Sequence, residues 1–182
     1  MEVPEQRLPT VNFEDLAMPL FDQLYNFARW LTQDTAEAED LVQETFAKAL
    51  RGFSSFQPGT NFRAWIYRIL RNSFLSSRSG FKATVPFDEE DHDTVGSSDA
   101  TPETLLLERS NREMVQQALA ELPIQYREIL LLCEVEEMSY QEIAETLAVP
   151  PGTVMSRLFR ARKALRNGVE SMQKPQGDRH GM

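Results

Sequence analysis

The sequence has 182 residues, of which 41% are hydrophobic and 26% are charged, and its formal net charge at pH 7 is −9. That length allows one or two globular domains. The longest apolar run, Ile129 to Cys133, is far shorter than the roughly 20 residues that span a bilayer, and the acidic N-terminus lacks the apolar stretch of a signal peptide. One cysteine and two distant histidines exclude a disulfide scaffold and match no metal-ligand spacing. We therefore expect a soluble, cytoplasmic protein without a metal site or cofactor.

The charge is distributed unevenly along the chain. Residues 1–80 have a net charge of −2, residues 81–103 of −6, residues 104–150 of −6 and residues 151–182 of +5. From Thr45 to Phe87 there is no acidic residue, whereas seven lysines and arginines lie there. Two basic blocks in an acidic chain favour a nucleic-acid surface, although charge runs also occur as solvated faces.

The first block is predicted to be helical. Apolar residues recur every three or four positions from Phe13 to Leu31 and predict a helix that kinks or restarts at Pro19. Asp34, followed three residues later by Glu37, is a capping-box pattern that predicts the start of a second helix. Its predicted buried stripe comprises Val42, Phe46, Ala49, Leu50 and Phe53. Its polar face comprises Asp40, Gln43, Glu44, Ala47 and Arg51.

A loop, a third helix and an acidic segment follow. Residues 54–61 have the composition of a loop, and the next helix has a predicted core side of Trp65, Ile66, Ile69 and Leu70. The stretch from Asp88 to Asp93 has little to bury and much charge to repel. We therefore predict a flexible acidic linker over 81–103 between helical domains at 1–80 and 104–182.

The C-terminal domain is also predicted to be helical. Thr101-Pro102 predicts a helix start, and Pro123 predicts the start of the next helix. The predicted apolar side of the first of these helices is Leu105, Leu106, Val115, Ala118, Leu119 and Leu122. The apolar positions of that second helix are Ile124, Ile129, Leu130, Leu132 and Val135. Ser139 and Glu142 form a second capping-box pattern before a short helix, and a break at 148–152 precedes a longer basic helix. This order is that of a helix-turn-helix motif.

The last helix has two distinct sides when it is projected at about 100° per residue. Its predicted apolar stripe is Val154, Leu158, Ala161 and Leu165. The predicted major-groove face is Ser156, Phe159, Arg160 and Lys163, flanked by Arg157, Arg162 and Arg166, which would reach phosphates. The alternative is an amphipathic helix whose basic face only solvates it, and an exposed Phe159 would argue against that.

Three motifs occur together in this chain: DLVQETF at 40–46, FRAWIYRILRN at 62–72, and SYQEIA at 139–144 with GTVMSRL at 152–158. In order and spacing they resemble the extracytoplasmic-function (ECF, group 4) sigma factors of the bacterial sigma-70 family, over about residues 12–170. The resemblance implies an all-α protein with two small domains. A region 2-like bundle would bind core polymerase and open the −10 promoter element, and a region 4-like helix-turn-helix would read the −35 element.

The resemblance also assigns roles to residues and partners. Asp40, Gln43 and Glu44 match positions that contact the β′ clamp helices of core RNA polymerase, whose β flap is a further implied contact. The −10 DNA contacts would be Ser55, Phe56, Gly59, Thr60, Asn61, Phe62, Arg68, Arg71 and Asn72. The −35 contacts would be Thr153, Ser156, Arg157, Phe159, Arg160, Arg162 and Lys163. An aromatic ring, a glycine and short polar side chains suit the loop for capture of an unpaired base, although an ordinary Pro-Gly connector has the same composition.

Further expectations concern regulation. The sequences Ala-Glu-Asp-Leu at 38–41 and Met-Ser-Arg-Leu at 155–158 look most like those of the subgroup controlled by redox-sensing zinc anti-sigma factors. This resemblance implies an anti-sigma partner and a stress response. Met155 stands where several relatives place a basic residue, so a contact available to them is missing here. Cys133 is predicted to be core packing. The acidic linker is expected to lie in a basic polymerase channel.

The sequence analysis leaves rival functions open. A sigma mimic could sequester an anti-sigma factor without binding DNA, but it should have lost one of the basic blocks. A nuclease with an appended helix-turn-helix would need a cluster of carboxylates or a histidine-based site, and the one dense cluster, Asp88 to Asp93, lies in the predicted linker. A dimeric repressor would leave the first domain without a role. The favoured prediction is a sigma factor that is not an enzyme.

Overall fold

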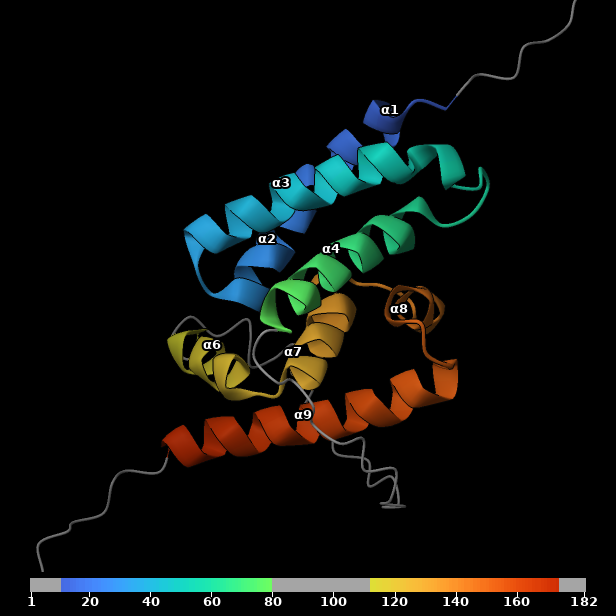
Figure 1. The fold of residues 1–182 in the computed structure, drawn as a ribbon. Coiled ribbons are helices and arrows are strands. Elements are labelled where there is room, and N and C mark those ends of the chain that lie inside the picture. The colour runs from blue at the N-terminus through green and yellow to red at the C-terminus, as the bar shows by residue number, and fades with distance from the viewer. Residues whose placement is uncertain (1–10, 80–111, 174–182) are drawn as a thin grey trace, which may run out of the picture. The chain divides into compact units, whose positions relative to one another are not determined.

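The computed structural model describes residues 11–79 and 112–173, and all of their regular elements are helices (Figure 1). The chain divides into two compact units after Ser77. The all-α prediction is thus confirmed. The predicted linker at 81–103, the helix start at Thr101 and the domain limits at residues 80 and 104 lie outside the described residues.

The first unit consists of α1 (Phe13–Ala17), the 3₁₀ turn η1 (Met18–Leu20), α2 (Phe21–Thr32), α3 (Thr35–Gly52), the 3₁₀ turn η2 (Phe53–Ser55) and α4 (Phe62–Arg78). Pro19 lies in η1, so the predicted restart is confirmed. Helix α2 ends at Thr32, and the next residue, Gln33, is left-handed with φ 61°. The Asp34 side chain then accepts a hydrogen bond from the Glu37 amide at 2.8 Å and caps α3.

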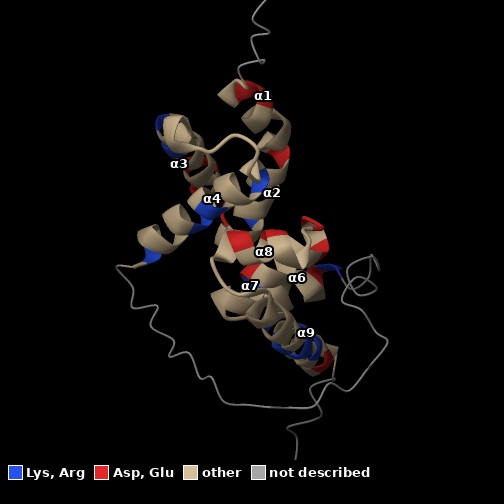
Figure 2. Ribbon diagram, turned by 90° about the vertical axis from the view of Figure 1, so that its right-hand side faces the viewer, with Lys and Arg blue, Asp and Glu red and all other residues tan. Residues whose placement is uncertain are grey.

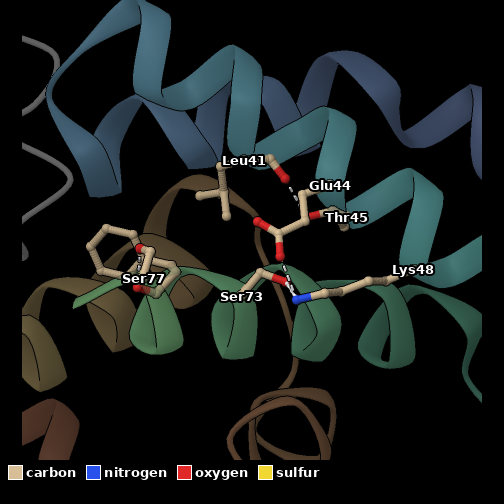
Figure 3. Close-up of polar contacts among 7 residues, drawn as sticks. Leu41, Glu44, Thr45, Lys48, Ser73 and Ser77 are labelled. Carbon is tan, nitrogen blue, oxygen red and sulfur yellow. Dashed lines mark hydrogen bonds and ion pairs between the residues drawn. The ribbon is translucent and has the colours of Figure 1, made fainter. Parts of the chain in front are cut away.

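The core of this unit differs in part from the predicted stripes. Leu50 is 60% exposed, because the buried side of α3 follows Ala38, Leu41, Val42, Thr45 and Ala49 and leaves position 50 outside it. Thr45 is accommodated there because its hydroxyl donates to the Leu41 carbonyl at 2.7 Å (Figure 3). On α4, Trp65 and Ile69 are only half-buried, and Tyr67 is fully buried against Phe27 with ring centroids 5.2 Å apart.

The second unit consists of α6 (Arg112–Glu121), α7 (Ile124–Leu130), the π-helical turn η4 (Leu131–Val135), α8 (Tyr140–Leu147) and α9 (Pro151–Gln173). Helix α9 packs against α6, α7 and α8, and its apolar side closes the core. Val135, predicted to be an apolar core position, is 39% exposed. The π turn inserts extra backbone into the helix and rotates the residues after it out of the predicted register.

A half-buried arginine closes the end of α6. The Arg127 guanidinium donates to the carbonyl oxygens of Leu119 at 2.8 Å, of Leu122 at 3.2 Å and of Ala120. These carbonyls lie at the end of a helix, where intrahelical partners run out, and the Leu119 carbonyl also accepts from the Leu122 amide at 3.2 Å. Burial lowers the pKa of Arg127. Arg127 therefore holds α6 to α7 and supports the platform on which α9 lies.

Candidate polymerase-binding and DNA-binding surfaces

The polar face of α3 is exposed as predicted. Asp40, Gln43 and Glu44 lie about one helical turn apart and are all accessible to solvent, because the core stripe occupies the other side of the helix. Figure 3 shows how Glu44 is connected to α4: its carboxylate pairs with Lys48 Nζ at 2.5 Å, and Lys48 Nζ donates to Ser73 Oγ at 3.0 Å. Ser73 is buried on α4, so this bridge fixes the two helices against each other.

An apolar groove that sequence reasoning missed adjoins this face. It has a volume of about 610 Å³ and is lined by residues of η1, α2 and α3: Met18, Phe21, Asp22, Tyr25, Glu39, Val42, Gln43 and Phe46. Met18 is 60% exposed and Phe21 is 43% exposed. The available signal in the sequence was that Met18 and Phe21 are large apolar residues outside the periodic set Phe13, Leu16, Ala17, Leu20, Leu24, Ala28 and Leu31. Gln43 belongs both to the groove and to the polar face.

The segment between α3 and α4 is built around aromatic rings. Phe56 stacks on Phe53 with ring centroids 5.9 Å apart and also contacts Phe62 and Trp65, at 5.3 Å and 5.2 Å. Phe62 is 8% exposed, so its predicted DNA contact is corrected to a role in the core. Phe56 is half-buried in this cluster, where one ring face is already used.

The polar residues of this loop mostly stabilise its own turns. Ser55 Oγ donates to the Gly52 carbonyl and Thr60 Oγ1 to the Gln57 carbonyl, both at 2.7 Å. Asn61 Oδ1 accepts from the Ala64 amide at 3.0 Å, at the start of α4. Gly59 has φ 88°, and nothing lies within 4 Å of the position that a Cβ would occupy. The turns of the loop are thus held by its own hydrogen bonds, and its side at Gly59 is open.

The predicted −10 residues of α4 remain at the surface. Asn72 is exposed, and Arg68 and Arg71 are half-buried. Arg63 lies over the ring of Tyr67, 5.7 Å from its centroid. Arginines give α4 a basic surface, and lysine and arginine also line α9 (Figure 2).

Helices α8 and α9 form the predicted helix-turn-helix motif. Ser139 Oγ accepts from the Glu142 amide at 3.2 Å while the Ser139 amide donates to Glu142 Oε2 at 2.9 Å, which confirms the capping box. Helix α8 ends at Leu147, the next residue, Ala148, is left-handed with φ 55°, and Pro151 begins α9. The predicted stripe of α9, Val154, Leu158, Ala161 and Leu165, is buried.

The outward side of α9 agrees with the prediction only in part. Ser156 and Lys163 are exposed, whereas Thr153, Phe159 and Arg160 are half-buried. The expectation of a freely exposed Phe159 is thus wrong. Arg157 is 9% exposed and belongs to the core side of the helix, next to Leu158, so its predicted position at the groove wall is corrected.

Arg162 is committed to a contact within the protein. Its Nη2 and Nε atoms donate to Glu134 Oε1 at 2.7 Å and 3.0 Å, and Nη2 lies 3.7 Å from Cys133 Sγ. Burial lowers the pKa of Arg162, but the hydrogen bond and charge of Glu134 outweigh it and raise the pKa overall. The predicted phosphate contact of Arg162 stays a prediction, and it would compete with this ion pair, because Glu134 already accepts from Nε and Nη2.

Cys133, predicted to be core packing, is half-buried beside this ion pair. Burial raises the pKa of its thiol, and the adjacent Glu134 carboxylate adds to that effect. The thiol is therefore protonated at neutral pH, which is typical of a structural cysteine.

Comparisons with known proteins agree with this geometry. The Sigma-70 region 2 family model matches residues 16–80, and the Sigma-70, region 4 model matches residues 112–165. The chain is 30% identical over 168 residues to the ECF RNA polymerase sigma factor SigW of Bacillus subtilis, covering 88% of this chain and 90% of that protein. The chain belongs to the ECF sigma factor family.

Two further comparisons place this sigma factor among its relatives. It is 37% identical over 157 residues to the ECF RNA polymerase sigma factor SigE of Mycolicibacterium smegmatis, covering 86% of this chain and 61% of that longer protein. The sigma factor RpoE of Bartonella quintana, solved in complex with the anti-sigma factor NepR, has a TM-score of 0.65 at 29% identity, covering 88% of this chain and 99% of that one. This sigma factor is a transcription initiation factor and not an enzyme. Within the ranges 11–79 and 112–173, no helix is long and apolar enough to cross a membrane.

Proposed function

We propose that this sigma factor binds core RNA polymerase with the outer face of α3, opens −10 DNA with the 55–61 loop and α4, and reads −35 DNA with α9. The observation that carries the proposal is the helix-turn-helix of α8 and α9, whose second helix buries one stripe and exposes Ser156 and Lys163 on another side. The proposed site of action is the bacterial cytoplasm, where core polymerase works.

The face of α3 suits a protein partner better than DNA. Asp40 and Glu44 would repel phosphates, and the groove beside Gln43 offers apolar surface to a helix of the partner. These features support the β′ clamp helices as the partner of the first unit. The β flap is the proposed polymerase contact of the second unit, on the strength of the family resemblance alone.

The −10 assignment is supported by charge and by the rigidity of the loop. Arg68, Arg71 and Asn72 line α4 outside the core, in a stretch without acidic residues. The aromatic cluster beneath Phe56 holds the loop in one shape, and Gly59 leaves its open side accessible to a base. We assign Phe62 to support of this loop.

The −35 assignment rests on the residues of α9 that face solvent at least in part: Thr153, Ser156, Phe159, Arg160 and Lys163. Arg157 and Arg162 act on DNA binding only through the fold, since one is buried and the other is paired with Glu134. The number of direct phosphate contacts is accordingly smaller than the sequence predicts.

An anti-sigma partner is supported by the likeness to the Bartonella quintana sigma factor, which was solved with its anti-sigma factor. A redox-sensing zinc protein as that partner rests only on the subgroup resemblance at 38–41 and 155–158. The half-buried Cys133 thiol, whose pKa burial raises, is a poor redox sensor, which supports a redox-sensitive group in the partner over one at Cys133.

In vitro transcription distinguishes a sigma factor from a sigma mimic. The full-length protein is mixed with core RNA polymerase and a promoter library, and transcripts are mapped to their templates. We expect transcripts from templates that share spaced −35 and −10 elements. A protein that binds an anti-sigma factor but yields no transcript from any template would be a mimic, and the proposed function would then be wrong.

A further inference from the structure

Within Pro151–Gln173, the large apolar side chain that α9 exposes is Met155. It is 58% exposed, whereas its neighbours Val154 and Leu158 on the core side are 0% and 1% exposed. It lies near the N-terminal end of α9, between Thr153 and Ser156. In a helix-turn-helix protein, the N-terminal residues of the second helix contact the edges of bases in the major groove.

The chemistry of methionine limits what it can contact there. A thioether has no hydrogen to donate and is a weak acceptor, so it cannot read the polar atoms of a base edge well. The apolar group that the major groove presents is the 5-methyl group of thymine. An unbranched, flexible and polarisable side chain adapts easily to such a contact.

We propose that Met155 reads the 5-methyl group of a thymine in the −35 element. This inference deepens the proposed function and rests on it, because it requires α9 to enter the major groove. The contact makes Met155 a specificity-determining residue that discriminates thymine without any hydrogen bond.

The surroundings of Met155 support this kind of contact. Ser156 Oγ donates to the Thr153 carbonyl at 3.2 Å, so the hydrogen of the neighbouring hydroxyl is used within the helix. Nothing lies within 4 Å of the Cβ position at Gly152, which leaves room for DNA one turn before Ser156. The first turns of α9 thus offer van der Waals surface, and the cationic side chains Arg160 and Lys163 come later in the helix.

The test replaces thymine by deoxyuridine, which removes the methyl group and keeps the base-pairing atoms. The probe is a promoter duplex selected by the holoenzyme from a random library, with each −35 thymine changed in turn. We expect one substitution to weaken binding of the wild-type holoenzyme about fourfold, the effect of one buried methyl group. Met155→Ala should bind the thymine duplex about fourfold more weakly and should be insensitive to that deoxyuridine.

Two control variants separate this contact from other effects. Met155→Leu retains apolar reach and should keep the deoxyuridine penalty, and Met172→Ala, near the C-terminal end of the same helix, should behave like the wild type. The inference is overturned if no deoxyuridine weakens wild-type binding, or if Met155→Ala shows the same penalty as the wild type at every position. Absence of transcription from every library template would instead overturn the proposed function, so the two failures are distinguishable.

Discussion

The ion pair between Arg162 and Glu134 should stabilise the second unit and contribute nothing directly to DNA binding. The Arg162 side chain is 35% exposed and the Glu134 side chain is 12% exposed. Both Nη2 and Nε of Arg162 donate to Oε1 of Glu134. Exposed ion pairs contribute about 0.2–1 kcal/mol and hydrogen bonds to charged groups about 1.5–3 kcal/mol. For a half-buried pair we therefore expect a coupling free energy of about 1–2 kcal/mol.

The chain contains a convenient way to assign such a loss to one unit. Both tryptophans, Trp30 and Trp65, lie in the first unit, so tryptophan fluorescence follows its unfolding while far-UV circular dichroism follows both units. Glu134→Ala and Arg162→Ala should each lower the midpoint temperature of unfolding of the second unit, followed by circular dichroism, by about 4–8 °C for each kcal/mol of stability lost. The fluorescence transition should stay unchanged, and the double variant should lose little more than either single variant.

The same variants test the DNA role of Arg162. Because its guanidinium is held by Glu134, Arg162→Ala should leave the dependence of promoter binding on salt concentration unchanged. Lys163→Ala, the matched control on the exposed side of α9, should lower that slope by about one unit. A lower slope for Arg162→Ala without any loss of stability would refute this reasoning and restore Arg162 as a phosphate contact.

Three further outcomes are expected. Asp40→Arg should weaken binding to core polymerase about tenfold in a pull-down. The control Glu14→Arg, an exposed charge reversal on α1, should leave that binding unchanged. Equal binding by both folded variants would show that the outer face of α3 is not the polymerase-binding surface. Arg127→Ala should destabilise the second unit by about 2–4 kcal/mol in urea denaturation, since it removes three charge-assisted hydrogen bonds to carbonyls at the end of α6, and a loss below about 0.5 kcal/mol would contradict the capping role. Because the pKa of the Cys133 thiol is raised in the folded state, the unfolded chain releases this proton first, and the free energy of unfolding should fall as the pH rises above the ordinary thiol pKa. Cys133→Ala should abolish that part of the fall, and an identical pH profile in the variant would show that the thiol titrates normally.

Sequence patterns predict those features of this sigma factor that depend on neighbours in the chain. The cap at Asp34 and the capping box at Ser139 each join groups three residues apart in the sequence. The helix restart at Pro19 follows from the ring of that single proline. The buried stripe of α9 follows from helical periodicity in the same way. The motifs that identify the family are likewise contiguous in the sequence.

Tertiary structure decides which polar residues near a site are available to a partner. Arg162 pairs with Glu134, 28 residues away, and Lys48 bonds to Ser73, 25 residues away, and no local pattern encodes either contact. The π turn at Leu131–Val135 changes the register of the helix, which exposes Val135 and presents Glu134 to α9. Phe62 is buried because the rings of Phe13 on α1 and Phe53 on η2 pack against it, and periodicity within one helix cannot report those contacts. The helices of this protein are therefore readable from its sequence, whereas the composition of its binding surfaces depends on how those helices pack.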